Sequence, residues 1–119
     1  MTIRHEQRGP VALVTIDRPE RRNAVDRASL EGLERALADA AAAGSRVLVL
    51  TGAAGHFCAG ADLSGVEDAE FVAALNRVLE GFRTAAFPTL AAVEGFALGA
   101  GTQLAVACDV RVARPDATF

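Results

Sequence analysis

Residues 89–104 read TLAAVEGFALGAGTQL, and this stretch decides the fold more than any other part of the chain. It begins with the short apolar run Thr89–Val93, which is typical of a buried β-strand. A glycine-rich turn, Gly95–Gly101, follows directly, and the small apolar residues from Thr102 to Ala107 predict a buried helix after it. A strand, a turn and a helix in this order favour an α/β fold with parallel strands.

The rest of the chain alternates strands and helices in the same way. Apolar runs and turn residues predict further strands, and apolar residues at helical spacing predict two amphipathic helices. The expected strands are 3–8, 11–16, 47–50 and 110–113, with a hairpin turn at Gly9-Pro10, and the expected helices run from an N-cap at Asp26 to about Ala43 and from Glu67 to Ala86.

Two features of this pattern carry further expectations. The run 47–50 is continuously apolar, which predicts a strand that is covered on both faces. No helix follows the strand at 110–113, so we expect residues 1–119 to be the N-terminal part of a longer single domain of the α/β class.

The composition is that of a globular protein. Of the 119 residues, 51% are hydrophobic, the formal net charge is −3 and the sequence pI is about 5.3. The acidic balance argues against nucleic-acid binding, which favours a basic surface. No apolar run approaches the roughly 18 residues that a membrane-spanning helix needs. The polar N-terminus does not resemble a secretory signal, so we expect a cytoplasmic protein.

Cysteine and lysine usage narrows the possible chemistry. Cys58 and Cys108 form no disulfide or zinc pattern, so we expect two buried thiols in a reducing cytoplasm. All twelve basic side chains are arginines, which excludes a Schiff-base lysine and a P-loop lysine within this segment. No group of residues has metal-ligand spacing, so no metal is expected.

Two glycine-rich turns, each after a predicted buried strand, are the chemically informative feature. The first reads GHFCAGADL over residues 55–63, and the second reads GFALGAGTQL over residues 95–104. Small residues allow a ligand to approach the main chain closely, and a turn that begins a helix presents free N–H groups. Two such turns that face one point can hold an oxygen that becomes negatively charged, as the oxygen of a thioester enolate does.

These turns have other interpretations. Each turn alone is more often structural than catalytic, because glycines after strands are common. A P-loop requires a lysine at position 101, where Gly101 stands. A dinucleotide fingerprint that begins at Gly99 matches Gly101 but meets Leu104 in place of its third glycine. Nucleotide binding is therefore disfavoured.

Three segments of the chain resemble the crotonase (enoyl-CoA hydratase/isomerase) family. They are DRPERRNAV at 17–25, FCAGADL at 57–63 and GFALGAGTQLA at 95–105, with Cys108-Asp109 after them. The segments occur in the family's order and at about its spacing, and the resemblance covers essentially the whole chain. The family is longer by roughly as much again, which agrees with an N-terminal part of one acyl-CoA-binding domain.

The resemblance implies a fold and a ligand. It implies a spiral of ββα units, usually assembled as homotrimers or hexamers, that binds an acyl-CoA thioester in a bent shape. Coenzyme A enters as part of the substrate, and no separate cofactor is implied.

The resemblance also assigns roles to individual residues. The oxyanion-hole donors correspond to the backbone N–H groups of Ala61 and Ala100, and Gln103 stands where hydratases carry the first of two catalytic glutamates. The implied substrate- and CoA-binding positions are Arg22, Ala24, Ala59, Gly60, Asp62, Leu63, Leu98 and Gly99. An arginine beside the adenine or the phosphates is chemically sensible, whereas Arg21 or Arg22 individually can equally be an exposed solubilising residue.

Gln103 is the departure from the hydratase pattern. The two glutamates of a hydratase orient a water and shuttle its proton, whereas an amide can orient water but is not a base at neutral pH. Efficient hydration is therefore not expected. Two hypotheses remain: an enzyme whose acid/base groups lie outside this segment, or an acyl-CoA-binding protein without catalysis. Gln103 also has a structural interpretation, as a polar residue near the start of a helix.

Four other polar residues lie close to the turns. Asp62 can contact the substrate or cap the turn that follows it. Asp109 is expected to form structural hydrogen bonds after the helix. His56 can titrate but can equally be a solvent-exposed loop residue, and Glu94 can point either way.

Overall fold

The chain begins with the predicted β-hairpin. The computed structural model describes residues 2–62 and 69–119. Strand β1 (Ile3–Arg8) pairs antiparallel with β2 (Val11–Ile16), and Gly9 at the turn has a φ of 57°, which suits glycine. The hairpin and its bounds are confirmed.

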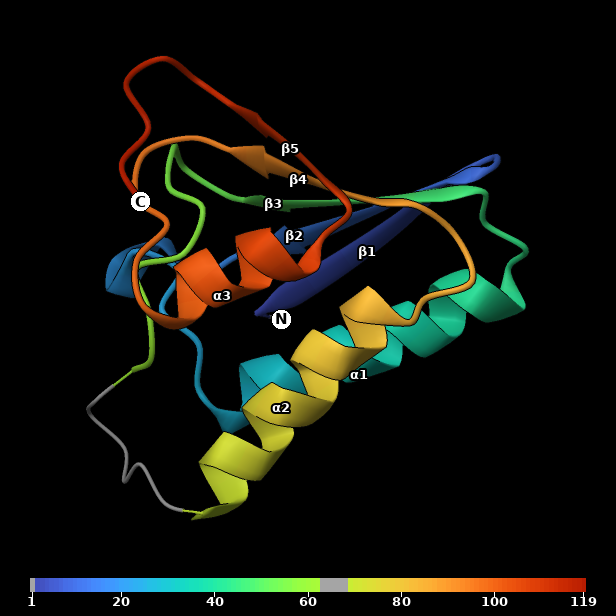
Figure 1. The fold of residues 1–119 in the computed structure, drawn as a ribbon, viewed down its shortest axis with the longest axis horizontal. Helices are drawn as coiled ribbons and strands as arrows, with labels where there is room; N and C mark the ends of the chain where they lie inside the picture. The colour runs from blue at the N-terminus through green and yellow to red at the C-terminus, as the bar shows by residue number, and fades with distance from the viewer. Residues whose placement is uncertain (1, 63–68) are drawn as a thin grey trace.

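Three further strands extend this hairpin into a five-stranded sheet. β3 (Val47–Gly52), β4 (Thr89–Val93) and β5 (Val110–Ala113) follow in chain order, and each pairs parallel with the strand before it. The carboxyl ends of β2 to β4 therefore meet at one edge of the sheet (Figure 1). The mixed, mostly parallel α/β class is confirmed.

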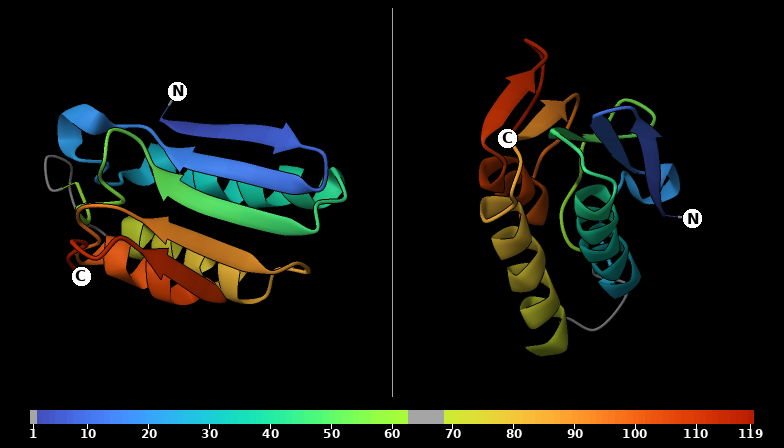
Figure 2. Two further views of the ribbon diagram at one scale, coloured as in Figure 1. Left: turned by 90° about the horizontal axis from the view of Figure 1, so that it is seen from above. Right: turned by 90° about the vertical axis from the view of Figure 1, so that its right-hand side faces the viewer.

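The helices lie on one face of this sheet (Figures 1 and 2). They are α1 (Arg27–Ala42), α2 (Ala69–Arg83) and α3 (Ala100–Ala107), and a short 3₁₀ helix, η1 (Pro19–Arg21), lies in the loop after β2. Asp26 caps α1 as predicted, because its side chain accepts a hydrogen bond from the Ser29 N–H at 2.8 Å. The predicted start of the second helix at Glu67 lies outside the described residues.

The core lies between the sheet and these helices. Alternate residues of β2 and β3, including Val14, Ile16, Leu48 and Leu50, point into it and are fully buried. α1 packs directly on β1, and a glycine allows this approach: a Cβ at Gly32 would lie 2.8 Å from Cγ1 of Ile3. None of the described helices is both long and apolar enough to cross a membrane.

The prediction that strand 47–50 is covered on both faces is wrong for the described residues. Leu48 and Leu50 face the helices, whereas Val47 and Val49 on the opposite face are only half-buried. The same face of the sheet continues onto β5, where Val110 and Val112 are 50% and 57% exposed. An apolar run predicts burial of a strand, but it does not determine which layer of the protein supplies the cover.

Candidate active site

The two glycine-rich turns lie side by side at the carboxyl edge of the sheet. The Cys58 N–H donates to the carbonyl of Phe96 at 2.9 Å, and the Leu98 N–H donates to the carbonyl of Cys58 at 3.0 Å. These bonds form a parallel bridge between Cys58 and Ala97. Gly101 makes this approach possible, since a Cβ there would lie 2.1 Å from the Cys58 carbonyl oxygen.

A third segment, from the loop after β2, pairs with the first turn. The Ala59 N–H donates to the carbonyl of Arg22. The Val25 N–H donates to the carbonyl of Gly60 at 2.9 Å, and the Asp62 N–H donates to the carbonyl of Val25 at 2.8 Å. Val25 thus bonds to both neighbours of Ala61 in the parallel bridge Val25–Ala61. Asn23, fully buried, anchors this loop because its side-chain amide donates to the carbonyls of Ala53 and His56.

Ala61 and Ala100 have N–H groups that donate to no backbone carbonyl among the described residues. For Ala61 the reason is the bridge pattern: Val25 bonds to the residues before and after it. For Ala100 the reason is its place as the first residue of α3, where an N–H has no partner within the helix. Both turns therefore present a free donor.

The two alanines line one pocket of about 720 Å³. Six of its lining residues are predicted site residues from the two turns, and three are apolar residues of α2. The described residues that line it are Ala59, Gly60, Ala61, Phe71, Val72, Leu75, Gly99, Ala100, Thr102 and Gln103. Tertiary structure thus brings both turns, 39 positions apart at Ala61 and Ala100, to the same cavity.

Comparison with known proteins identifies the family of the chain. The family model described as enoyl-CoA hydratase/isomerase matches residues 6–119. The chain belongs to this family. A probable enoyl-CoA hydratase of Mycobacterium bovis is 42% identical over 110 residues, which cover 92% of this chain and 45% of that protein. The 2,3-dehydroadipyl-CoA hydratase of Escherichia coli is 46% identical over 114 residues, with the same coverage of 92% and 45%.

A solved structure of an enoyl-CoA hydratase/isomerase also resembles this chain over about half of its own length. The enoyl-CoA hydratase/isomerase of Xanthobacter autotrophicus Py2 superimposes with a TM-score of 0.93 at 33% identity, and the match covers 100% of this chain and 48% of that one. The crotonase-type α/β fold is therefore confirmed. The chain spans about half the length of the curated relatives it matches.

Gln103 is one of the polar residues that line the pocket. It lies in the first turns of α3, its side chain is exposed, and it lines the pocket beside Ala100. Its backbone N–H donates to the Gly99 carbonyl at 3.1 Å, so the backbone there is helical while the amide remains available to a ligand.

Arg22, Ala24 and Leu98 are not among the described residues that line the pocket. Arg22 is exposed and has a left-handed φ of 52°, and Ala24 is buried at 9% exposure. Leu98 helps to join the turns, because its N–H donates to Cys58 and its carbonyl accepts from Gly101. Leu63 lies outside the described residues.

Asp62 forms an ion pair that sequence reasoning did not anticipate. Its carboxylate accepts from the Arg18 guanidinium at 2.9 Å, and the two side chains are 7% and 11% exposed. The sequence analysis gives Arg18 no role of its own, although an arginine in the loop after β2 and an acid beside the first turn are a usable signal for such a pair. The second site feature that was missed is the apolar wall of α2.

Other titratable residues near the turns have structural positions. The His56 ring stacks on Phe96 with centroids 5.2 Å apart. The Asp109 carboxylate accepts from the Thr89 N–H at 2.9 Å, as expected of a structural hydrogen-bonder. Cys58 and Cys108 are buried and free, as predicted, and burial raises the pKa of both thiols to about 11. Both thiols are therefore protonated at neutral pH.

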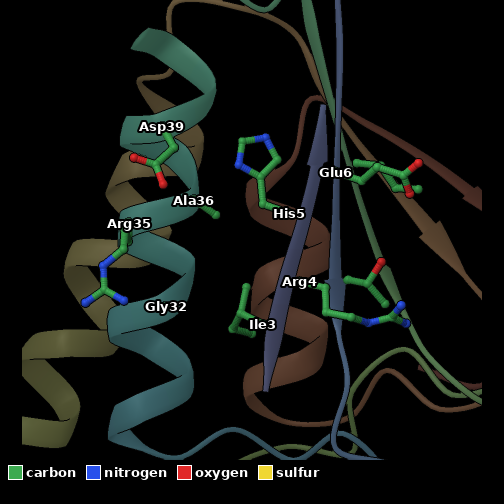
Figure 3. A pocket seen from close by; sticks show the side chains of 10 residues that line it. Ile3, Arg4, His5, Glu6, Gly32, Arg35, Ala36 and Asp39 are labelled. Atoms are coloured by element: carbon green, nitrogen blue, oxygen red, sulfur yellow. The ribbon is translucent and has the colours of Figure 1, made fainter. Parts of the chain in front are cut away.

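A second pocket, of about 540 Å³, lies between β1, β2 and α1 (Figure 3). It shares no lining residue with the first and is bordered by side chains of regular elements, among them Ile3, His5, Arg35 and Asp39. Among residues 2–62 and 69–119, no group of three or more His, Cys, Asp or Glu side chains is placed to hold a metal ion.

Proposed function

We propose that this chain binds an acyl-CoA thioester and stabilises the enolate of its acyl group through two backbone N–H groups. The observation that carries the proposal is the pair of donors at Ala61 and Ala100, which line one pocket and have no carbonyl acceptor among the described residues. Membership of the enoyl-CoA hydratase/isomerase family supports the choice of thioester.

The chemistry follows from where charge develops. When a proton leaves the carbon beside a thioester carbonyl, or when a nucleophile adds to the β-carbon of an enoyl thioester, negative charge collects on the carbonyl oxygen. Preorganised donors stabilise that charged oxygen more than the neutral carbonyl, so they lower the barrier as well as binding the substrate.

The pocket walls suit the two ends of such a ligand. Phe71, Val72 and Leu75 of α2 form an apolar wall opposite the turns, and we assign the acyl chain to it. Arg22 is exposed in the segment that pairs with Ala59, and we assign it to the CoA moiety. A homotrimeric or hexameric assembly remains a prediction from the resemblance, and a cytoplasmic location remains a prediction from the cysteines and the polar N-terminus.

Paired thioester and thioether ligands test the proposed donors. Calorimetric titration of the protein with butyryl-CoA and with S-butyl-CoA, which lacks the carbonyl oxygen, isolates the contribution of the two N–H groups. We expect the thioester to bind about 10- to 100-fold more tightly, since each hydrogen bond contributes about 0.5–1.5 kcal/mol. Absence of heat with acyl-CoA thioesters of several chain lengths, or equal affinity for both ligands, would contradict the proposal.

A second candidate function is acyl-CoA binding without hydration, and Gln103 favours it. The side chain lines the pocket but cannot accept a proton at neutral pH. We expect slow hydration of crotonyl-CoA for this reason. A turnover rate in the range of ordinary enzymes, about 1–10³ s⁻¹, would show that Gln103 is not the handicap proposed.

A further inference from the structure

The buried contact between Arg18 and Asp62 joins two loops that are 44 residues apart in the chain. Its side chains are 11% and 7% exposed, whereas the ion pair Arg4–Asp17, with the same N–O distance of 2.9 Å, is 59% and 31% exposed. Exposed pairs contribute little to stability, but breaking a buried pair is costly. Of these two ion pairs, Arg18–Asp62 is therefore the one that holds its two loops together.

One guanidinium group holds both strands of the bridge that contains Ala61. Nη1 of Arg18 donates to the carbonyl of Ala24, and Nη2 donates to the carboxylate of Asp62 at 2.9 Å. Ala24 precedes Val25 on one strand, and Asp62 follows Ala61 on the other. The planar group thus spans the bridge at the point where the Ala61 N–H is left without an acceptor.

The same guanidinium also reaches the start of α1. Nη2 of Arg18 lies 3.5 Å from the carboxylate of Asp26, which caps this helix. Burial acts to raise the pKa of Asp26, but hydrogen bonds from Ser29 and the charge of Arg18 outweigh it, so this pKa lies below its ordinary value. The Arg18 guanidinium therefore contacts two carboxylates and a carbonyl. The ammonium group of a lysine lacks the planar fork of N–H donors that reaches all three.

We propose that Arg18 is a positioning residue for the oxyanion-hole donor of Ala61, acting through Asp62 and the carbonyl of Ala24. This inference rests on the proposed function, because it concerns the orientation of one of the two proposed N–H donors. Arg18 is not among the described residues that line the pocket, so we expect it to act through the groups that it holds. Its effect is on the part of binding that depends on the thioester oxygen.

The test compares Arg18→Lys and Arg18→Met with Arg4→Met as the matched control. For each protein the ratio of the affinities for butyryl-CoA and S-butyl-CoA is measured by calorimetry, and folding is checked by thermal unfolding. We expect Arg18→Lys to lower this ratio about 3- to 10-fold, the effect of about one hydrogen bond. Arg18→Met should lower it at least as far, and Arg4→Met should leave it unchanged.

The ratio separates positioning from general structural damage. If Arg18→Lys weakens both ligands equally, or leaves both unchanged, Arg18 does not position the donor and the inference is overturned. Should Arg18→Met fail to fold, the folded Arg18→Lys protein still decides the question. If the unsubstituted protein does not prefer the thioester at all, the proposed function itself fails, which is a distinct result.

Discussion

The two pockets of the molecule differ in what their walls are made of. The pocket between β1, β2 and α1 is bordered by side chains of regular elements (Figure 3). The pocket at the carboxyl edge is bordered by small residues at the ends of elements, including Gly60, Ala61 and Ala100. Its two donors at Ala61 and Ala100 have no backbone carbonyl acceptor among the described residues, because one begins a helix and the other lies opposite Val25 in a single bridge.

The largest expected effect comes from restoring the missing base in the carboxyl-edge pocket. Gln103→Glu places a carboxylate where the amide now lines the cavity. We expect the rate of crotonyl-CoA hydration, measured by loss of enoyl absorbance, to rise about 10²- to 10⁴-fold, the usual contribution of one acid/base group.

Gln103→Ala is the control, since it removes the amide without adding a base and should give no rise. If Gln103→Glu is no faster than the unsubstituted protein, a second acid/base group is absent and acyl-CoA binding without catalysis becomes the better account.

The next effect comes from removing one proposed donor without changing the fold. Ala100 is the first residue of α3, a position that tolerates proline, so Ala100→Pro deletes the N–H while keeping the helix start. We expect kcat for the reaction that the protein catalyses, measured in the Gln103→Glu background, to fall about 10²- to 10³-fold.

Arg27→Pro is the matched control, because Arg27 is the first residue of α1 and does not line this pocket. Equal losses in the two proline variants would mean that helix damage, rather than the missing donor, explains the result.

The smallest expected effect is on the free energy of unfolding. It compares a glycine between the two turns, Gly101, with a glycine that lines the other pocket, Gly32. A Cβ at Gly101 meets the backbone oxygen of Cys58 at 2.1 Å, whereas one at Gly32 meets the Ile3 side chain at 2.8 Å. We expect Gly101→Ala to lower the free energy of unfolding by about 1–3 kcal/mol or more, because backbone must shift. Gly32→Ala should be nearly neutral, because a gain in helix propensity of about 1 kcal/mol offsets the displacement of Ile3. Urea denaturation of both variants checks this order; the reverse order would show that the two turns are not held as tightly as described.

Local signals predicted most of the fold. The hairpin at β1 and β2, the Asp26 cap and the strands at β4 and β5 follow from alternation, capping chemistry and apolar runs, all of which act within a few residues. The cover of β3 was predicted wrongly, because a run of apolar residues does not specify which layer lies on each face.

The candidate site likewise has features that local sequence predicts and features that depend on tertiary contacts. The sequence by itself indicated two glycine-rich turns where a ligand can approach the main chain, and a turn that begins a helix and so leaves N–H groups free, since these are local features. Only tertiary structure decided that Ala61 and Ala100 share a pocket, that α2 supplies its apolar wall, and that Arg18 reaches Asp62. These contacts join residues that are far apart in the chain, and they depend on the sheet order and on the bridges between loops, which no local propensity encodes.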